Sequence, residues 1–389
     1  NNNVEHYESK LKNNKGLFIA IPCLREQKTI EETVGHFRKI CNLPIVIITT
    51  QKECFESNYS KDYITTSAIV KRNILGKYNN VYLINYPFEK GYMADQLNFM
   101  LDNFKQLKFY DSTKEWYMAL YNADSAPPNG TFESIFYHIN RDERVIQQYS
   151  YCFKNFTKLD FISKGFAIYQ SNFEIKVGLF NSYLNYKYLY NYVVGHGLVI
   201  SLETLKKLGN FNTKFWCEDI YLTMKLKYTN ISICPISNLE NIENASSLKQ
   251  IIKQNSVWYD TTKKYRKVYK DIKMKEEKKS FFGLVGCLNE FRCAINWLLF
   301  PIIFILDIVI CICSQNNIIL SLIILFFSYW LYSFINYYVT INTINRLNNE
   351  NYKLTIYHYC AFLLALLISN VGPIYSLIFR KKEKYKTER

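Results

Sequence analysis

GLFIAIP (residues 16–22) and PIVIITT (residues 44–50) decide the fold, because both are short apolar runs rich in β-branched side chains. Such runs predict strands that are buried on both faces. In residues 26–40, between the two runs, apolar side chains recur every three or four positions, which predicts a helix. A strand, a helix and a second strand in this order predict a parallel βαβ unit.

The same alternation continues along the first part of the chain. Further strands are predicted at VYLINY (residues 81–86) and WYMALYN (residues 116–122), and further helices at residues 62–75 and 93–107. We therefore expect a mostly parallel, Rossmann-like α/β sheet with helices on both faces. Ligands of such sheets bind beyond the carboxyl ends of the strands, so candidate site residues should follow strands directly.

Hydrophobicity divides the chain of 389 residues into a soluble part and an apolar part. We predict a cytosolic α/β domain in residues 1–262, a basic linker with an amphipathic interface helix in 263–296, membrane helices in 297–379 and a basic tail in 380–389. The first fifteen residues are polar, so we expect no signal peptide there. The eleven cysteines include no CxxC pair, which indicates reduced thiols in a cytosolic compartment rather than a zinc site.

The charge pattern favours a membrane over nucleic acid. The net charge is +15, and basic clusters at residues 263–279 and 380–386 flank the apolar part. Lys and Arg beside membrane helices stay in the cytosol, so we expect a multi-pass protein of the cell membrane with both clusters on the cytosolic side. Two membrane crossings place both basic clusters on the cytosolic side.

The last apolar run, residues 355–379, contains Gly372 and Pro373 and is expected to kink or to re-enter the membrane from the same side.

Asp124 and Glu218-Asp219 are the first candidate site residues. Asp124 follows the fourth predicted strand, where a carboxylate can hold Mg²⁺ or Mn²⁺ together with phosphate oxygens; it can equally start the turn before Pro127. Glu218 and Asp219 open a predicted helix, where Asp219 is placed to take a proton from a hydroxyl or simply to cap the helix.

Two further segments have less specific patterns. Gln254 and Trp258 suit a sugar ring, because Trp can stack on the ring and Gln can bond its hydroxyls; an amphipathic helix at the membrane surface explains them equally well. Gly195-His196-Gly197 allows close backbone approach to a ligand, or a plain turn or bulge.

The order of these segments resembles the family 2 glycosyltransferases, in particular the membrane-integrated group that includes cellulose, chitin and hyaluronan synthases. The similarity runs from residue 16 to about residue 259, and Arg25 stands where the family's opening IPxxNE turn has Asn. The similar segments are IAIPCLRE (residues 19–26, like IPxxNE), KGYMADQLN (90–98, like GKxxALN), NAD (122–124, like DxD), residues 195–219 (like the segment that ends in a TED box) and QNSVW (254–258, like QxxRW).

The resemblance implies a nucleotide-diphospho-sugar transferase fold and an inverting single displacement. A sugar would pass from a nucleotide sugar, with a UDP-sugar favoured, to a glycan or lipid-linked acceptor at the bilayer. Asp219 would be the general base, supported by Glu218, and Asp124 would hold Mn²⁺ or Mg²⁺. The implied donor-binding residues are Pro22, Glu26, Glu53, Lys90, Asn98 and Asp124, and the implied acceptor-binding residues are Gly195, His196, Gly197, Gln254 and Trp258.

Three departures from the family pattern keep alternatives open. Asn122 replaces one acid of the DxD motif, Val257 replaces an Arg, and only Glu53 can stand in for the acidic pair that reads the nucleotide base. These departures favour a non-catalytic, membrane-anchored sugar-nucleotide-binding or scaffold protein. The presence of Asp124 and the Glu218-Asp219 pair favours an enzyme, which would make either a processive polysaccharide or a single-sugar product. Nucleic acid is not an expected partner.

Overall fold

The computed structural model describes residues 10–55, 63–180, 192–215, 217–276, 280–313 and 317–379. The chain divides into two compact units. The first unit comprises Asn1–Tyr149, Tyr192–Leu226 and Asn230–Glu240, and the second comprises Ser150–Asn191, Lys227–Thr229 and Asn241–Arg389. Compact units and functional domains need not coincide, so the boundary at residue 262 stays a prediction. The basic tail, residues 380–389, lies outside the described residues.

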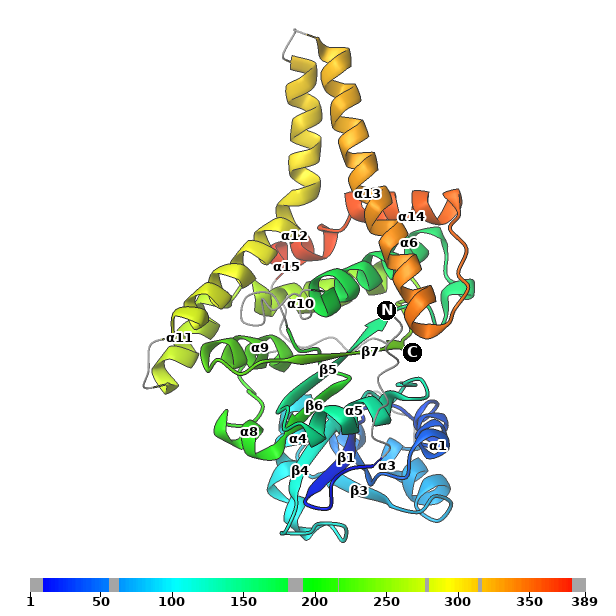
Figure 1. Ribbon diagram of the computed structural model, residues 1–389, viewed down its shortest axis with the longest axis vertical. Coiled ribbons are helices and arrows are strands. Elements are labelled where there is room, and N and C mark those ends of the chain that lie inside the picture. Colours follow the sequence, from blue (N-terminus) through cyan, green and yellow to red (C-terminus); the bar gives the residue numbers. More distant parts are fainter. Residues whose placement is uncertain are drawn as a thin grey trace. The chain divides into compact units, whose positions relative to one another are not determined.

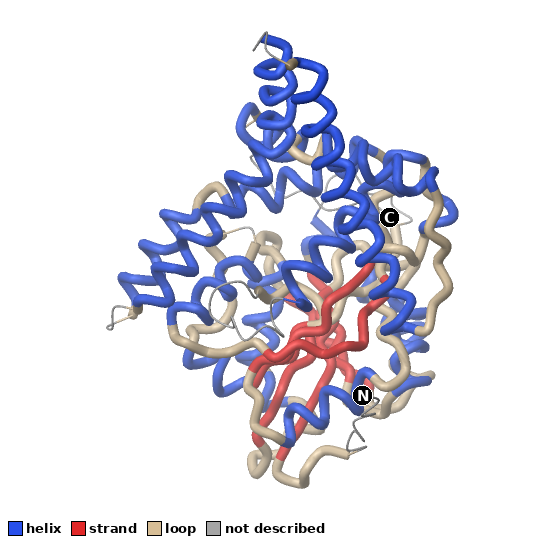
Figure 2. The backbone as a smooth tube through the Cα atoms, turned by 45° about the horizontal axis from the view of Figure 1, so that its top comes forward, coloured by secondary structure: helices blue, strands red, loops and turns tan. Residues whose placement is uncertain are grey.

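A seven-stranded sheet in the order β3-β2-β1-β4-β6-β5-β7 forms the centre of the fold (Figure 2). Neighbours among β1, β2, β3 and β4 are parallel, whereas β6 runs antiparallel to both β4 and β5. The strands are β1 Lys15–Pro22, β2 Ile45–Thr50, β3 Val81–Tyr86, β4 Glu115–Leu120, β5 Val145–Tyr151, β6 Leu198–Ser201 and β7 Cys234–Asn241. The predicted α/β class with a mostly parallel sheet is confirmed.

Both faces of the parallel strands are buried by helices. In β1, Leu17 and Ile19 face α1 (Ile30–Ile40) and α5 (Thr131–Asn140). Phe18 and Ala20 belong to the opposite core, which includes α4 (Met93–Asp102), α8 (Leu202–Lys207) and α9 (Glu218–Tyr228). Burial on both faces explains why these strands read as continuous apolar runs.

Helix bounds differ from the predictions where turns replace helical residues. The helix predicted at residues 26–40 begins only at Ile30, because residues 23–29 form a turn in which Arg25 has a left-handed φ of +59°. The helix predicted at 62–75 is α3 (Thr66–Ile69) continued by the π-helical turn Val70–Ile74. The helix predicted at 93–107 is α4 followed by the short 3₁₀ turn Phe104–Gln106.

The second unit is largely helical (Figure 1). Its elements are α6 Phe161–Phe173, the π-helical turn Glu174–Phe180, α10 Leu248–Thr262, α11 Tyr265–Lys275, α12 Phe281–Cys313, α13 Ile318–Asn348, α14 Ile356–Leu367 and α15 Val371–Ile378. Much of the predicted basic linker is therefore helix α11, and residues 277–279 lie outside the described residues. The predicted interface helix and the first apolar run form one continuous helix, α12, with Pro301 inside it.

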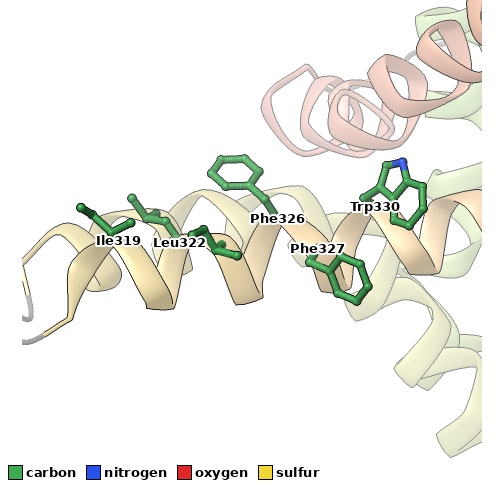
Figure 3. A pocket seen from close by; sticks show the side chains of 6 residues that line it. Ile319, Leu322, Phe326, Phe327 and Trp330 are labelled. Atoms are coloured by element: carbon green, nitrogen blue, oxygen red, sulfur yellow. The ribbon is translucent and has the colours of Figure 1, made fainter.

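Three helical stretches of the described chain are long and apolar enough to cross a membrane: Gly283–Cys313, Ile318–Asn348 and Ile356–Ile378. Only 6% of the most apolar window is buried in each of the first two, against 50% in the third. A groove of about 510 Å³ on α13 is lined by apolar side chains alone, including Phe326, Phe327 and Trp330 (Figure 3). Apolar exposure on this scale is typical of a helix that faces lipid.

The third stretch is interrupted, as the sequence predicted, and packs on helices of its own unit. α14 ends at Leu367 and α15 begins at Val371. A Cβ at Gly165 of α6 would overlap the backbone of Ala361 in α14, and a Cβ at Gly372 of α15 would overlap Asn255 in α10. These glycines let the helix axes approach closely.

Gly16 permits a close cross-strand contact between β1 and β4. Its register partner is Trp116, and a Cβ at Gly16 would lie 2.6 Å from the indole Cε3. The indole cannot move freely, because it is buried and its Nε1 donates to Asp111 O at 2.9 Å. We expect Gly16→Ala to destabilise the first unit by about 1–3 kcal/mol.

The matched control for Gly16→Ala is Gly76→Ala, since a Cβ at Gly76 meets no heavy atom within 4 Å. Thermal unfolding of the full chain in detergent would measure the difference between the two variants. Equal melting temperatures would show that the sheet accommodates the methyl group.

Candidate functional site

The loop after β4 carries Asp124, which is buried with 7% of its surface exposed. Two side chains of α1 hold this loop from one side. Thr33 Oγ1 donates to Ala123 O at 2.6 Å, and His36 Nε2 lies 2.7 Å from Pro127 O. The loop is therefore fixed at the carboxyl end of the sheet, where parallel α/β sheets bind ligands.

The Gly195-His196-Gly197 segment is a tightly held turn that leads into β6. Gly197 has a φ of +65°, and a Cβ there would lie 2.5 Å from Gln148 O, so only glycine fits. The side-chain amide of Gln147 donates to His196 O at 2.9 Å and accepts from the backbone N–H of Val194 at 3.0 Å. Gln147 of β5 therefore holds the backbone bend at residues 195–197, and contact of this segment with a ligand stays a prediction.

The acidic pair opens α9, as the sequence predicted, and lies beside this turn. Glu218 is buried and Asp219 is half-buried. A Cβ built on Gly195 would lie 3.7 Å from Asp219 Oδ2, 3.8 Å from Glu218 Oε1 and 3.5 Å from Met93 Cε at the start of α4. Three segments that are far apart in the sequence therefore meet at Gly195. Because glycine has no side chain, residue 195 itself does not cover the two carboxylates.

Sequence reasoning missed Glu240, near the end of β7. Its side chain is fully buried, with Oε1 accepting from the backbone N–H of Ala126 at 2.9 Å and Oε2 lying 3.3 Å from His196 Nδ1.

Burial, with the nearby charge of Glu240, raises the pKa of Tyr121 well above its usual value, so the Tyr121 hydroxyl stays protonated and donates to Gln148. The one sign of Glu240 in the sequence was an acidic residue within a strand-like segment.

Several predicted donor-side residues hold the framework of the first unit. Glu53 is fully buried, and its carboxylate accepts from the backbone N–H groups of Arg25 and Thr66, each at 2.7 Å. The backbone N–H of Glu26 donates to Thr66 Oγ1 at 2.9 Å. These contacts tie the turn after β1 to the segment after β2, and a direct role in donor binding stays a prediction for both acids.

Asn98 on α4 is engaged with the segment that leads to the acidic pair. Its side-chain amide donates to Phe211 O at 2.9 Å and accepts from Phe211 N–H at 3.0 Å. Lys90 is exposed, and its carbonyl accepts from Tyr86 Oη at 3.1 Å. Pro22 ends β1. Contact of these residues with a donor likewise stays a prediction.

A cavity of about 420 Å³ lies at the carboxyl ends of β2 and β3, in the first unit. Its lining is mixed polar and apolar and comprises Thr50, Gln51, Cys54, Thr65, Ser67, Ala68, Lys71 and Asn85. Among these described residues Lys71 is the charged one, and none of the eight is a carboxylate.

Gln254 and Trp258 lie on α10, in the second unit, whereas Asp124 and the acidic pair belong to the first. Their predicted role at the acceptor remains a prediction. No cluster of three or more His, Cys, Asp or Glu side chains suited to a metal occurs in the described part of the chain.

No protein-family model matches this sequence, and no curated protein matches it. Among solved structures, the mannosyltransferase PcManGT from Pyrobaculum calidifontis, in complex with GDP-Man and Mn²⁺, is similar, with a TM-score of 0.50 and 12% sequence identity. The match covers 93% of this chain and 87% of that one. The likeness is one of fold: this chain shares the α/β fold of that mannosyltransferase.

Proposed function

We propose that this chain is a membrane-bound, inverting glycosyltransferase of the family 2 type. It would transfer a sugar from a nucleotide sugar to a saccharide or lipid-linked acceptor. The observation that carries the proposal is the meeting of Glu218, Asp219 and Gly195 at one place in a glycosyltransferase-type fold. A half-buried carboxylate at a helix N-terminus, with no side chain at residue 195 to cover it, is accessible to an acceptor hydroxyl.

Asp219 would act as the general base. It would take the proton of the acceptor hydroxyl as that oxygen attacks the anomeric carbon, and the bond to the nucleoside diphosphate would break. Glu218, more deeply buried, would orient the acceptor. The Met93 side chain and the backbone of Gly195 would keep this part of the site narrow.

Asp124 would hold the divalent cation, together with diphosphate oxygens of the donor. A bound Mn²⁺ or Mg²⁺ supplies charge that stabilises a leaving diphosphate. The residues present fit such an ion, because Asp124 is a carboxylate at the carboxyl end of a parallel strand and Mg²⁺-type sites need only one or two protein carboxylates. The cavity beside β2 and β3 is a candidate for the nucleoside, with a UDP-sugar or GDP-sugar as donor.

The membrane arrangement that we propose has two crossings. α12 and α13 would form the spanning hairpin, with the soluble domain in the cytosol, because both helices expose apolar side chains along their outer halves. α14 and α15 would lie at the base of this hairpin. Trp297 Nε1 of α12 donates to Ser369 O at 3.0 Å, and Tyr359 Oη of α14 lies 2.9 Å from Ser333 Oγ of α13.

Asp219→Asn tests the base directly, since it keeps shape and removes basicity. Sugar transfer should fall by at least about 10²-fold while donor binding survives. The measurement is nucleoside diphosphate release from a panel of nucleotide sugars by the purified protein in detergent, with acceptor present. Asp102→Asn, an exposed acid of α4, is the control. Near-normal transfer by Asp219→Asn excludes the assignment, and no transfer by any protein of the set favours the non-catalytic alternative.

Removal of the metal tests Asp124. Calorimetric titration with GDP and UDP should give at least about tenfold tighter binding with Mn²⁺ than with a chelator, because Asp124 would hold a cation whose charge favours a bound diphosphate. Asp124→Ala should abolish the difference, whereas Asp102→Ala should keep it. Equal affinity with and without Mn²⁺ in the unaltered chain would argue against a metal-dependent donor site.

Cysteine labelling tests the two-crossing arrangement in a chain whose own cysteines are replaced. A cysteine at residue 317, the start of α13, should react with an impermeant thiol reagent on intact cells, because it would lie at the far end of the hairpin. A cysteine at residue 385 should react only after permeabilisation. Labelling of residue 385 on intact cells would instead favour three full spans.

A further inference from the structure

Glu240 joins two loops that both belong to the proposed site. Ala126, whose N–H it accepts at 2.9 Å, is two residues beyond Asp124. His196, whose Nδ1 lies 3.3 Å from its other carboxylate oxygen, directly follows Gly195, the residue that borders Asp219 and Glu218. One side chain therefore contacts the donor-side loop and the acceptor-side turn at once.

The burial of this carboxylate makes both contacts obligatory. Glu240 has no exposed surface, and His196 is only 8% exposed. A buried carboxyl group that loses a hydrogen-bond partner costs far more than an exposed one, because water cannot replace the lost hydrogen bond. Movement of either loop away from Glu240 would leave one of its buried oxygens without a hydrogen bond, so the two loops are held in one relative arrangement.

The backbone around His196 has little freedom to yield. Gln147 bonds His196 O and Val194 N–H, and Gly197 has no room for a Cβ. Thr223 of α9 accepts from Val193 N–H at 3.0 Å, which ties the turn to the helix that carries the acidic pair. A change in the bond between His196 and Glu240 is therefore expected to shift the Glu240 carboxylate and to weaken its hydrogen bond with the backbone N–H of Ala126.

We propose that Glu240 and His196 form a positioning bridge, which sets the distance between the cation held at Asp124 and the base Asp219. This inference rests on the proposed function. Neither residue touches the reacting atoms in this role. His196 would act through the Asp124 loop, so a substitution on the acceptor side of the site should weaken metal-dependent binding on the donor side.

The experiment compares two substitutions of His196 that differ in one hydrogen bond. His196→Leu keeps volume and removes the N–H. His196→Asn is the matched control, because its side-chain amide can donate from about the position of Nδ1. Hydrogen exchange of the full chain in detergent, followed in peptides that cover residues 121–130, reports the amide of Ala126. Exchange there should quicken about tenfold or more in His196→Leu and stay near normal in His196→Asn.

Mn²⁺ titration measures the metal affinity, which a purely structural bridge would not change. With GDP or UDP present, the Mn²⁺ concentration for half-saturation should rise roughly three- to thirty-fold in His196→Leu and return toward normal in His196→Asn. Glu203→Gln, which removes an exposed carboxylate on α8, should change neither measurement. If His196→Leu does not fold, Glu240→Gln is measured in the same way, with a smaller rise expected because the amide keeps an acceptor for Ala126.

The outcomes separate this inference from the proposed function. Unchanged exchange at residues 121–130 in His196→Leu overturns the bridge, whatever the protein binds. Faster exchange with unchanged Mn²⁺ half-saturation overturns the positioning role alone. Absence of any Mn²⁺-dependent nucleotide binding in the unaltered chain overturns the proposed function and the positioning role with it, while the exchange result still decides whether the two loops are coupled.

Discussion

Burial of the parallel strands on both faces is the constraint on which the rest of the first unit depends. From Leu17 to Ile21 no side chain of β1 is more than 2% exposed, and every residue of β2 is buried. Such strands cannot carry reactive polar groups along their length without large desolvation costs. Chemistry is therefore confined to the strand ends, and the loop that carries Asp124 is found there. The acidic pair and the glycine turn reach the same region from outside the parallel strands.

The parts of the fold that the sequence predicted well are those in which a local pattern has one physical solution. β1, β2 and β3 are apolar runs flanked by polar residues, and their observed bounds are within one residue of the predicted ones. Helix starts were less accurate, because residues 23–29 are kept out of α1 by contacts made far along the chain. Glu53, for example, takes the N–H groups of Arg25 and Thr66, and nothing local to residue 25 indicates such a partner.

The candidate site shows the same division. That Glu218 opens a helix followed from residue types alone, whereas the proximity of Gly195 to both carboxylates did not, since it depends on β6 pairing antiparallel to β4 and β5. Glu240 could not be recognised, because an acid in a strand-like segment is ordinarily assigned to the solvent face. Only the register of β7 and the depth of its burial distinguish a bridging carboxylate from an exposed one.

Hydropathy alone could not separate the third apolar stretch from the other two, and the reason lies in helix packing. Gly165 has no side chain where α6 meets α14, and Gly372 has none where α10 meets α15. These helices therefore bury apolar surface against each other.

At the start of α12, Gly283 and Gly286 likewise leave room for the side chains of Tyr228 and Lys227. The Lys227 ammonium, 2% exposed, pairs there with Glu290 at 2.9 Å. A buried charge is costly unless it is paired, so this ion pair holds the start of α12 against Lys227. Most of the exposed apolar side chains of α12 follow Trp297, in the half of the helix beyond this ion pair.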